Sequence, residues 1–100
     1  MTVRVIGRMT ADPALMDKLF SERKSDFEAI AAEARTLGAL HHEFLRGDGE
    51  VLLVDEWGSA EQFQKFFAEQ KVIPSLMADA GVTTRPEINI YEVMDSPDKF

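Results

Sequence analysis

The apolar residues of this chain follow two different periods in successive segments. Four short segments carry apolar side chains at alternate or consecutive positions, which is typical of β-strands. Two longer segments repeat apolar side chains at intervals of three or four residues, which predicts amphipathic helices. The predicted strands are residues 2–9, 39–46, 51–57 and 87–94, and the predicted helices begin after Asp12 and Ser59.

The first helix has clear start and stop signals. Asp12 can accept hydrogen bonds from unpaired backbone N–H groups, and Pro13 suits the first helical position because it has no N–H to lose. Gly38 ends the helix because glycine enters the left-handed conformation cheaply. The polar residues 21–25 are a point where the helix could bend, and we predict one continuous helix through them.

The second half of the chain has equally local signals. Asp48-Gly49 between two strand-like segments predicts a hairpin with a two-residue turn. Ser59 and Gln62 form a capping box at the start of the second helix. Pro74 divides this helix from a shorter helical piece over residues 75–80.

The order of elements predicts one α+β domain over residues 1–100, with a ferredoxin-like β-α-β-β-α-β order and an antiparallel four-stranded sheet. Two helices cover only one face of such a sheet. The third strand nevertheless has Val51 and Leu53 on one face and Leu52 and Val54 on the other, so both faces are apolar. A second copy of the chain is the simplest cover, and we predict a homodimer in which two sheets form a barrel.

Composition and charge narrow the chemistry. The net charge of −7 disfavours binding to nucleic acid or to anionic membranes, and the lack of cysteine excludes thiolate nucleophiles and thiolate metal sites. No apolar run approaches the roughly 20 residues of a membrane span, and the N-terminus lacks the apolar stretch of a secretory signal. We expect a cytoplasmic protein. There is no phosphate loop and no metal-ligand cluster, so no cofactor or metal is predicted.

The hairpin predicts one chemically active group of residues. With a two-residue turn, His42 lies opposite Asp55, Phe44 opposite Leu53, and Leu40 opposite Trp57, so that all six share one face with about 5 Å between opposed Cβ atoms. A histidine oriented by a carboxylate on an apolar face suits a general base. A three-residue turn would instead place His41 opposite Asp55. A histidine–aspartate pair across two strands is more often a purely structural contact.

Residues 38–44 (GALHHEF), 47–49 (GDG) and 51–63 (VLLVDEWGSAEQF) resemble the middle of the antibiotic biosynthesis monooxygenase-like family. The resemblance implies a dimeric α+β barrel with a ligand pocket between sheet and helices, bordered by Trp57. Members include cofactor-independent monooxygenases that act on aromatic quinols and anthrones, isomerases, and haem-degrading relatives. The histidine that ligates haem in those relatives is missing from residues 64–69, and Leu53 and Phe63 replace an asparagine and a tyrosine of some quinol-oxidising members.

The leading hypothesis is a cofactor-independent monooxygenase or isomerase that acts on a small aromatic substrate, with His42 and Asp55 as catalytic residues. The alternatives are a non-catalytic protein that binds a small apolar ligand in the same pocket, and a structural dimer with a filled core. The residues predicted to bind substrate are Trp57, Leu53, Phe44, Phe63 and Phe67.

Overall fold

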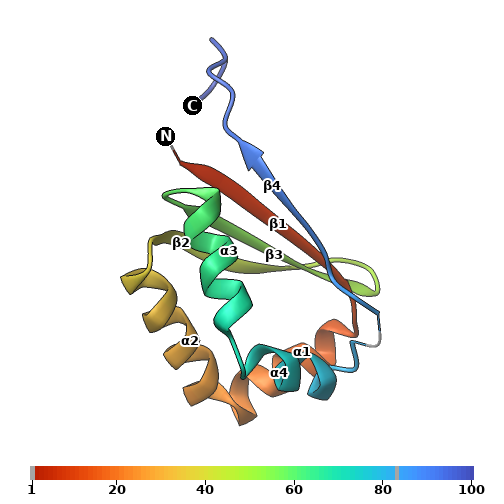
Figure 1. The fold of residues 1–100 in the computed structure, drawn as a ribbon. Helices are drawn as coiled ribbons and strands as arrows, with labels where there is room; N and C mark the ends of the chain where they lie inside the picture. The colour runs from red at the N-terminus through yellow and green to blue at the C-terminus, as the bar shows by residue number, and fades with distance from the viewer. Residues whose placement is uncertain (1, 83) are drawn as a thin grey trace.

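The computed structural model describes residues 2–82 and 84–100. In this part of the chain one four-stranded sheet carries four helices on one of its faces (Figure 1). The predicted ferredoxin-like α+β order is confirmed, with each predicted helical segment present as two helices. The strands are β1 (Val3–Thr10), β2 (Ala39–Arg46), β3 (Glu50–Trp57) and β4 (Glu87–Glu92), and the helices are α1 (Pro13–Glu22), α2 (Lys24–Thr36), α3 (Ala60–Glu69) and α4 (Ile73–Asp79).

The sheet has the strand order β2-β3-β1-β4, and all neighbouring strands are antiparallel. The hairpin between β2 and β3 has the predicted turn. The N–H of Gly47 donates to the carbonyl of Glu50 over 2.9 Å. Gly49 adopts a φ of 67°, where glycine avoids the steric cost of a side chain. This turn brings His42 opposite Asp55 and Phe44 opposite Leu53, as predicted.

The prediction that Leu40 lies opposite Trp57 is wrong. A β-bulge between Ala39 and His41 places Ala39 opposite Trp57 and leaves Leu40 unpaired and 61% exposed. A bulge adds one residue to a strand and locally increases its twist. Beyond the bulge the strands come together again, because the N–H of Gly58 donates to the carbonyl of Gly38 over 3.0 Å.

The prediction of a single helix between Pro13 and Leu37 is also wrong. Arg23 has φ −118° and ψ 35°, which ends α1 and begins α2 in a new direction. The guanidinium of Arg23 donates to Asp26 over 2.9 Å and also to Asp79 and Ser75 of α4, over 2.9 and 3.2 Å. The residue at the bend is therefore held by side chains of α4, which are remote from it in the sequence.

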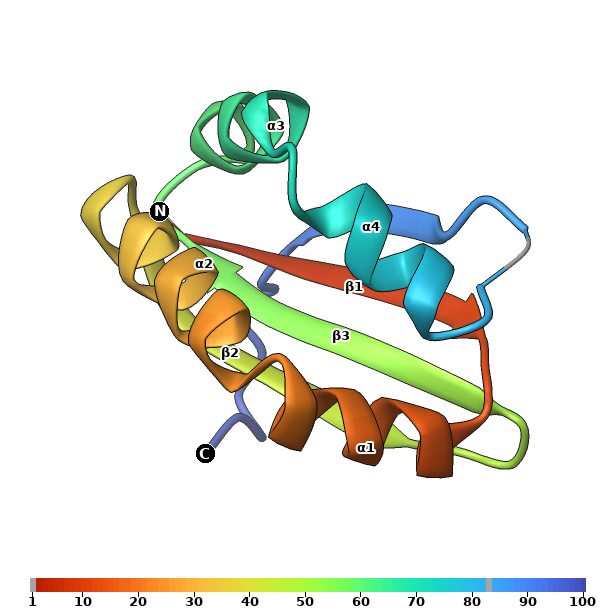
Figure 2. The ribbon, with the colours of Figure 1, turned by 90° about the horizontal axis from the view of Figure 1, so that it is seen from below.

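The second pair of helices follows its local signals. The Ser59 hydroxyl accepts from the N–H of Gln62 over 3.2 Å at the start of α3, as a capping residue should. The predicted division of the two helices at Pro74 is wrong, because α3 ends at Glu69 and α4 already begins at Ile73, with Pro74 in its first turn, where proline has no helical N–H bond to lose. In the view of Figure 2, β1 and β3 are seen in the gap between the α1–α2 pair and the α3–α4 pair, which lie on the same face of the sheet.

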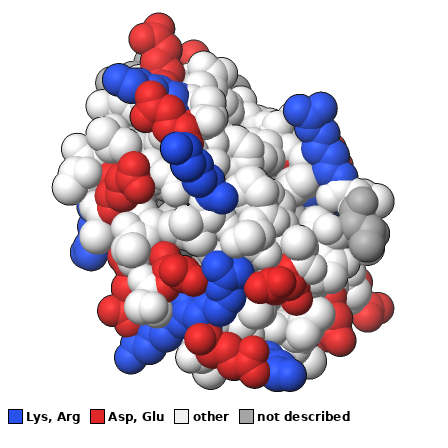
Figure 3. Space-filling view, turned by 60° about the horizontal axis from the view of Figure 1, so that its bottom comes forward, with Lys and Arg blue, Asp and Glu red and all other residues white. Residues whose placement is uncertain are grey.

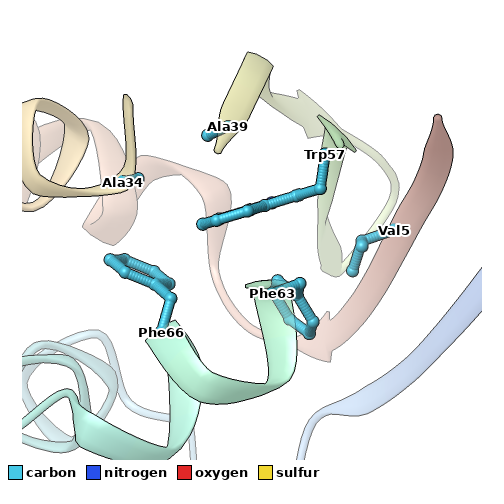
Figure 4. Packing of buried hydrophobic residues seen from close by; sticks show 6 residues of the cluster. All are labelled: Val5, Ala34, Ala39, Trp57, Phe63 and Phe66. Carbon is cyan, nitrogen blue, oxygen red and sulfur yellow. The ribbon is translucent and has the colours of Figure 1, made fainter. Parts of the chain in front are cut away.

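Two apolar clusters hold the helices on the sheet. Figure 4 shows the first, in which Trp57 lies between the sheet and α3. The ring of Trp57 is fully buried, with ring centroids 5.6 Å from Phe63 and 5.1 Å from Phe66. Aromatic contacts at such separations add to the gain from burial. The second cluster consists of Met9, Ala11, Met16, Leu19, Val51 and Ala80.

The opposite face of the sheet carries none of the described helices (Figure 1). Ile6, Leu45 and Tyr91 are 37%, 42% and 49% exposed there, and Arg4 forms an ion pair with Glu56 over 2.8 Å. On the side seen in Figure 3 acidic and basic side chains are interspersed, and neither sign forms a continuous patch. None of the helices in residues 2–82 and 84–100 has the length and hydropathy needed to cross a membrane.

Candidate functional site

A cavity of about 420 Å³ lies between the sheet and the helices. This volume falls within the range of about 300–1,000 Å³ that is typical of small-ligand pockets. Its walls come from both pairs of helices, with Phe27 and Ile30 on α2 facing Phe66 on α3 and Leu76 on α4. The alternative of a core filled completely by these aromatic residues does not apply to this structure.

Most of the predicted site residues line this cavity. Phe44 and Leu53 come from the paired strands β2 and β3, and Phe63 and Phe67 come from α3. The rings of Phe63 and Phe67 stack with centroids 5.6 Å apart, so they present a continuous aromatic wall. Their contact with a substrate stays a prediction.

Trp57 has a different position from the one predicted. Its side chain is 0% exposed and does not belong to the lining of the cavity. A substrate in the cavity therefore has no direct access to its ring in this structure. Trp57 acts on the site through its indole N–H, which donates to Asp55 Oδ2 over 3.1 Å.

Asp55 connects the tryptophan to the histidine. Its side chain is 8% exposed, and the residue lies on β3 directly opposite His42 of β2. Asp55 Oδ1 lies 2.7 Å from His42 Nδ1, while Oδ2 accepts from Trp57. An ionised carboxylate only accepts hydrogen bonds, so Nδ1 carries the proton and Nε2 is the basic nitrogen of the neutral ring. Asp55 thus fixes both the orientation and the tautomer of His42.

His42 lies where the cavity meets solvent. Its side chain is 40% exposed although its partner Asp55 is buried. The imidazole ring packs edge-on against Phe44, with centroids 5.0 Å apart and planes at 83°. The described residues give Nε2 no hydrogen-bond partner, so this nitrogen is available to a bound molecule. The arrangement can accept a proton from an acidic group held against the aromatic wall.

The neighbouring histidine has a different environment. His41 Nε2 lies 3.0 Å from Glu43 Oε2, and both side chains are about half exposed. The residues that alternate with His42 along β2 belong to the other face of the sheet. His41 belongs to the cavity lining as well, but its ring is paired with the exposed Glu43 and not with the buried Asp55, so this second histidine–carboxylate pair provides a matched control for His42 and Asp55.

Several wall residues were not among the predicted site residues. Most of them belong to amphipathic stripes. Such a stripe predicts that its side chains are buried, but it does not predict which other element they face across a cavity. Arg35, near the end of α2, lines the cavity as well and carries a charge. The unpredicted apolar members include Met16, Ile30, Ile73, Leu76, Met77 and Ile88.

No protein-family model matches the sequence. No curated protein matches it either. Solved structures do match. SnoaB, a cofactor-independent oxygenase from Streptomyces nogalater, has a TM-score of 0.66 at 19% identity, and the match covers 98% of each chain. Rv0793 from Mycobacterium tuberculosis has a TM-score of 0.62 at 16% identity, covering 98% of this chain and 100% of that chain.

A third structure, described as an antibiotic biosynthesis monooxygenase, has a TM-score of 0.66 at 12% identity. That match covers 92% of this chain and 98% of the other. The structural neighbours are thus proteins of the antibiotic biosynthesis monooxygenase type, and the fold is that of their α+β barrels. At such low identity the likeness shows the fold alone. The chemistry of this chain must be argued from the residues of its own site.

Proposed function

We propose that this protein is a cofactor-independent monooxygenase that acts on a small aromatic substrate of the quinol or anthrone type. The observation that carries the proposal is the buried Asp55 carboxylate, which orients His42 at the mouth of an otherwise apolar cavity. The cavity has room for an aromatic ring system and an aromatic wall at Phe63 and Phe67 to hold it. SnoaB supports the proposal through its fold and its described activity.

In the proposed reaction Nε2 of His42 removes a proton from a phenol or from an activated C–H group of the substrate. The resulting anion is electron-rich and passes electrons to molecular oxygen. For an anthrone, one oxygen atom of O₂ becomes the new carbonyl and the other leaves as water, so the substrate itself is the reductant. Asp55 stabilises the imidazolium that forms, and the apolar walls keep bulk water from the anion.

One observation favours a second function, a protein that binds an apolar ligand without converting it. Leu53 and Phe63 provide no polar group to the cavity at the positions where the resemblance leads one to expect asparagine and tyrosine. The substrate oxygen would then have fewer hydrogen-bond partners to hold it in a reactive orientation. Binding and turnover must therefore be measured separately.

The direct test is oxygen consumption with anthrone, corrected for the rate without protein. We expect turnover by the wild type and a loss of at least about 100-fold in His42→Gln, the scale of general-base catalysis. His41→Gln, the matched histidine on the same strand, should retain the wild-type rate. Anthrone that binds without any oxygen uptake would support the non-catalytic function. A His42→Gln variant as active as the wild type would eliminate His42 as the base.

The proposal also includes a homodimer formed through the helix-free face of the sheet. This face exposes apolar side chains between the ion pairs Arg4–Glu56 and Arg8–Glu50. Contiguous apolar surface of this kind commonly marks an interface. A second copy provides a matching surface because a twofold axis pairs each patch with itself. The apolar members are Ile6, Leu45, Leu52, Val54 and Tyr91.

A further inference from the structure

The charged groups that line the cavity differ in how they are paired. Asp55 is occupied on both oxygens by His42 and Trp57, and His41 is paired with Glu43. Arg35 also lines the cavity, and the described residues provide it with no hydrogen bond or ion pair. Arg35 is solvent-exposed, and it is the one Lys or Arg among the described residues that line this otherwise apolar cavity.

The position of Arg35 follows from the packing of α2 on β2. Phe27, Ala31 and Arg35 are spaced four residues apart, so they form one stripe along α2. Phe27 packs against Phe44 of β2, with ring centroids 6.2 Å apart. Arg35 follows two helical turns further along the same stripe, and it lines the cavity together with Leu40 of β2.

Ala31 of the same stripe and His42 of β2 both line the cavity. Leu40 lies in the β-bulge with 61% of its surface exposed. The part of the cavity wall that α2 and β2 form thus includes both His42, with its basic nitrogen, and the cation Arg35.

We propose that Arg35 binds a carboxylate group of the aromatic ligand, so that the substrates of this site are aromatic acids. The ring would lie between Phe44, Phe63 and Phe67 while the carboxylate remains at the mouth of the cavity. A guanidinium matches a carboxylate through two parallel hydrogen bonds. A single unpaired cation suits a carboxylate better than a doubly charged phosphate. This inference rests on the proposed function, because it requires an aromatic ligand in the cavity.

The test compares two probes of nearly equal size, 1-naphthoate and the uncharged 1-naphthamide, by isothermal titration calorimetry. The proteins are the wild type, Arg35→Met, which keeps most of the apolar stem, and Arg35→Lys, which keeps the charge. Lys24→Met is the matched control, because Lys24 is an exposed cation at the other end of α2, 3.7 Å from Glu28. It removes the same charge away from the cavity.

We expect the wild type to bind naphthoate about tenfold more tightly than naphthamide, a difference typical of one charge-assisted contact at a partly exposed site. Arg35→Met should reduce this preference to less than about twofold through weaker naphthoate binding, while naphthamide binding stays unchanged. Arg35→Lys should retain part of the preference and Lys24→Met all of it. Binding of naphthamide without any preference for naphthoate would overturn the role of Arg35 alone. Failure of both probes to bind would contradict the aromatic cavity ligand itself, and this inference with it.

Discussion

The most informative perturbation of the site is the replacement of Asp55 by asparagine. The side-chain amide has nearly the same shape as the carboxylate but pairs one acceptor with one donor. Its oxygen can still accept from Trp57 Nε1, which is fully buried and needs an acceptor. Its NH₂ group then faces His42 Nδ1, which must become an acceptor to keep the contact. We therefore expect the proton of His42 to move from Nδ1 to Nε2.

The expected magnitudes follow from burial. Asp55→Ala leaves the indole N–H of Trp57 without a partner, and His42, 40% exposed, can turn to water. An unsatisfied buried donor that has lost a charged acceptor should destabilise the fold by about 2–3 kcal/mol. Asp55→Asn keeps both contacts and should cost less than about 1 kcal/mol. Glu43→Gln, in the exposed pair with His41, should change stability by less than about 0.5 kcal/mol.

Two measurements check this expectation. Urea unfolding gives the free energies of the wild type and the three variants, and long-range ¹H–¹⁵N spectra of the imidazole ring report which nitrogen carries the proton. The Asp55→Asn variant should also lose oxygen consumption with anthrone although it remains folded, because Nε2 can no longer accept a proton. Retention of the Nδ1 proton in Asp55→Asn would refute the reasoning, as would an Asp55→Ala variant no less stable than Glu43→Gln.

Three further predictions concern the rest of the molecule. Leu45→Glu on the helix-free face should convert the expected dimer to a monomer, as measured by light scattering. Val72→Glu, on the helical side, should leave the dimer intact. A monomeric wild type would contradict the proposed interface. The carboxylate of Asp26, followed by that of Asp79, raises the pKa of Arg23, and the contact with Asp79 joins the start of α2 to α4. Arg23→Met should therefore speed amide hydrogen exchange in α4 relative to Lys24→Met. Equal exchange in the two variants would refute this link. Hydrogen bonds from Thr2 and then Arg4 lower the pKa of Glu56. The charge of Glu56 therefore stabilises the fold above the usual glutamate pKa of about 4.3. This stabilisation is lost as the pH falls through the lower pKa of the folded state. Glu56→Gln should therefore lose less stability than the wild type below about pH 4.3 in urea titrations, and parallel curves would contradict this.

Local chemistry was sufficient to predict the part of the site that lies on the hairpin. Asp48-Gly49 selects a two-residue turn, and the strict period of two along each strand then pairs His42 with Asp55 without any knowledge of the helices. The β-bulge in β2 was missed because it goes with a contact between segments that are remote in the sequence. It leaves Leu40 unpaired next to the contact between Gly38 and Gly58, two residues that are remote in the sequence.

The sequence by itself determined the order of elements, the strand register near the turn, and the presence of apolar side chains on both faces of the sheet. These depend on periodicity, capping residues and turn residues, all of which act over a few positions. Only the tertiary structure decided that the helix bends at Arg23, that Trp57 lies behind Asp55 and not in the cavity lining, and that Arg35 belongs to that lining. The size and lining of a cavity depend on how far apart two helix pairs lie on the sheet, and the packing of residues distant in the chain determines that separation.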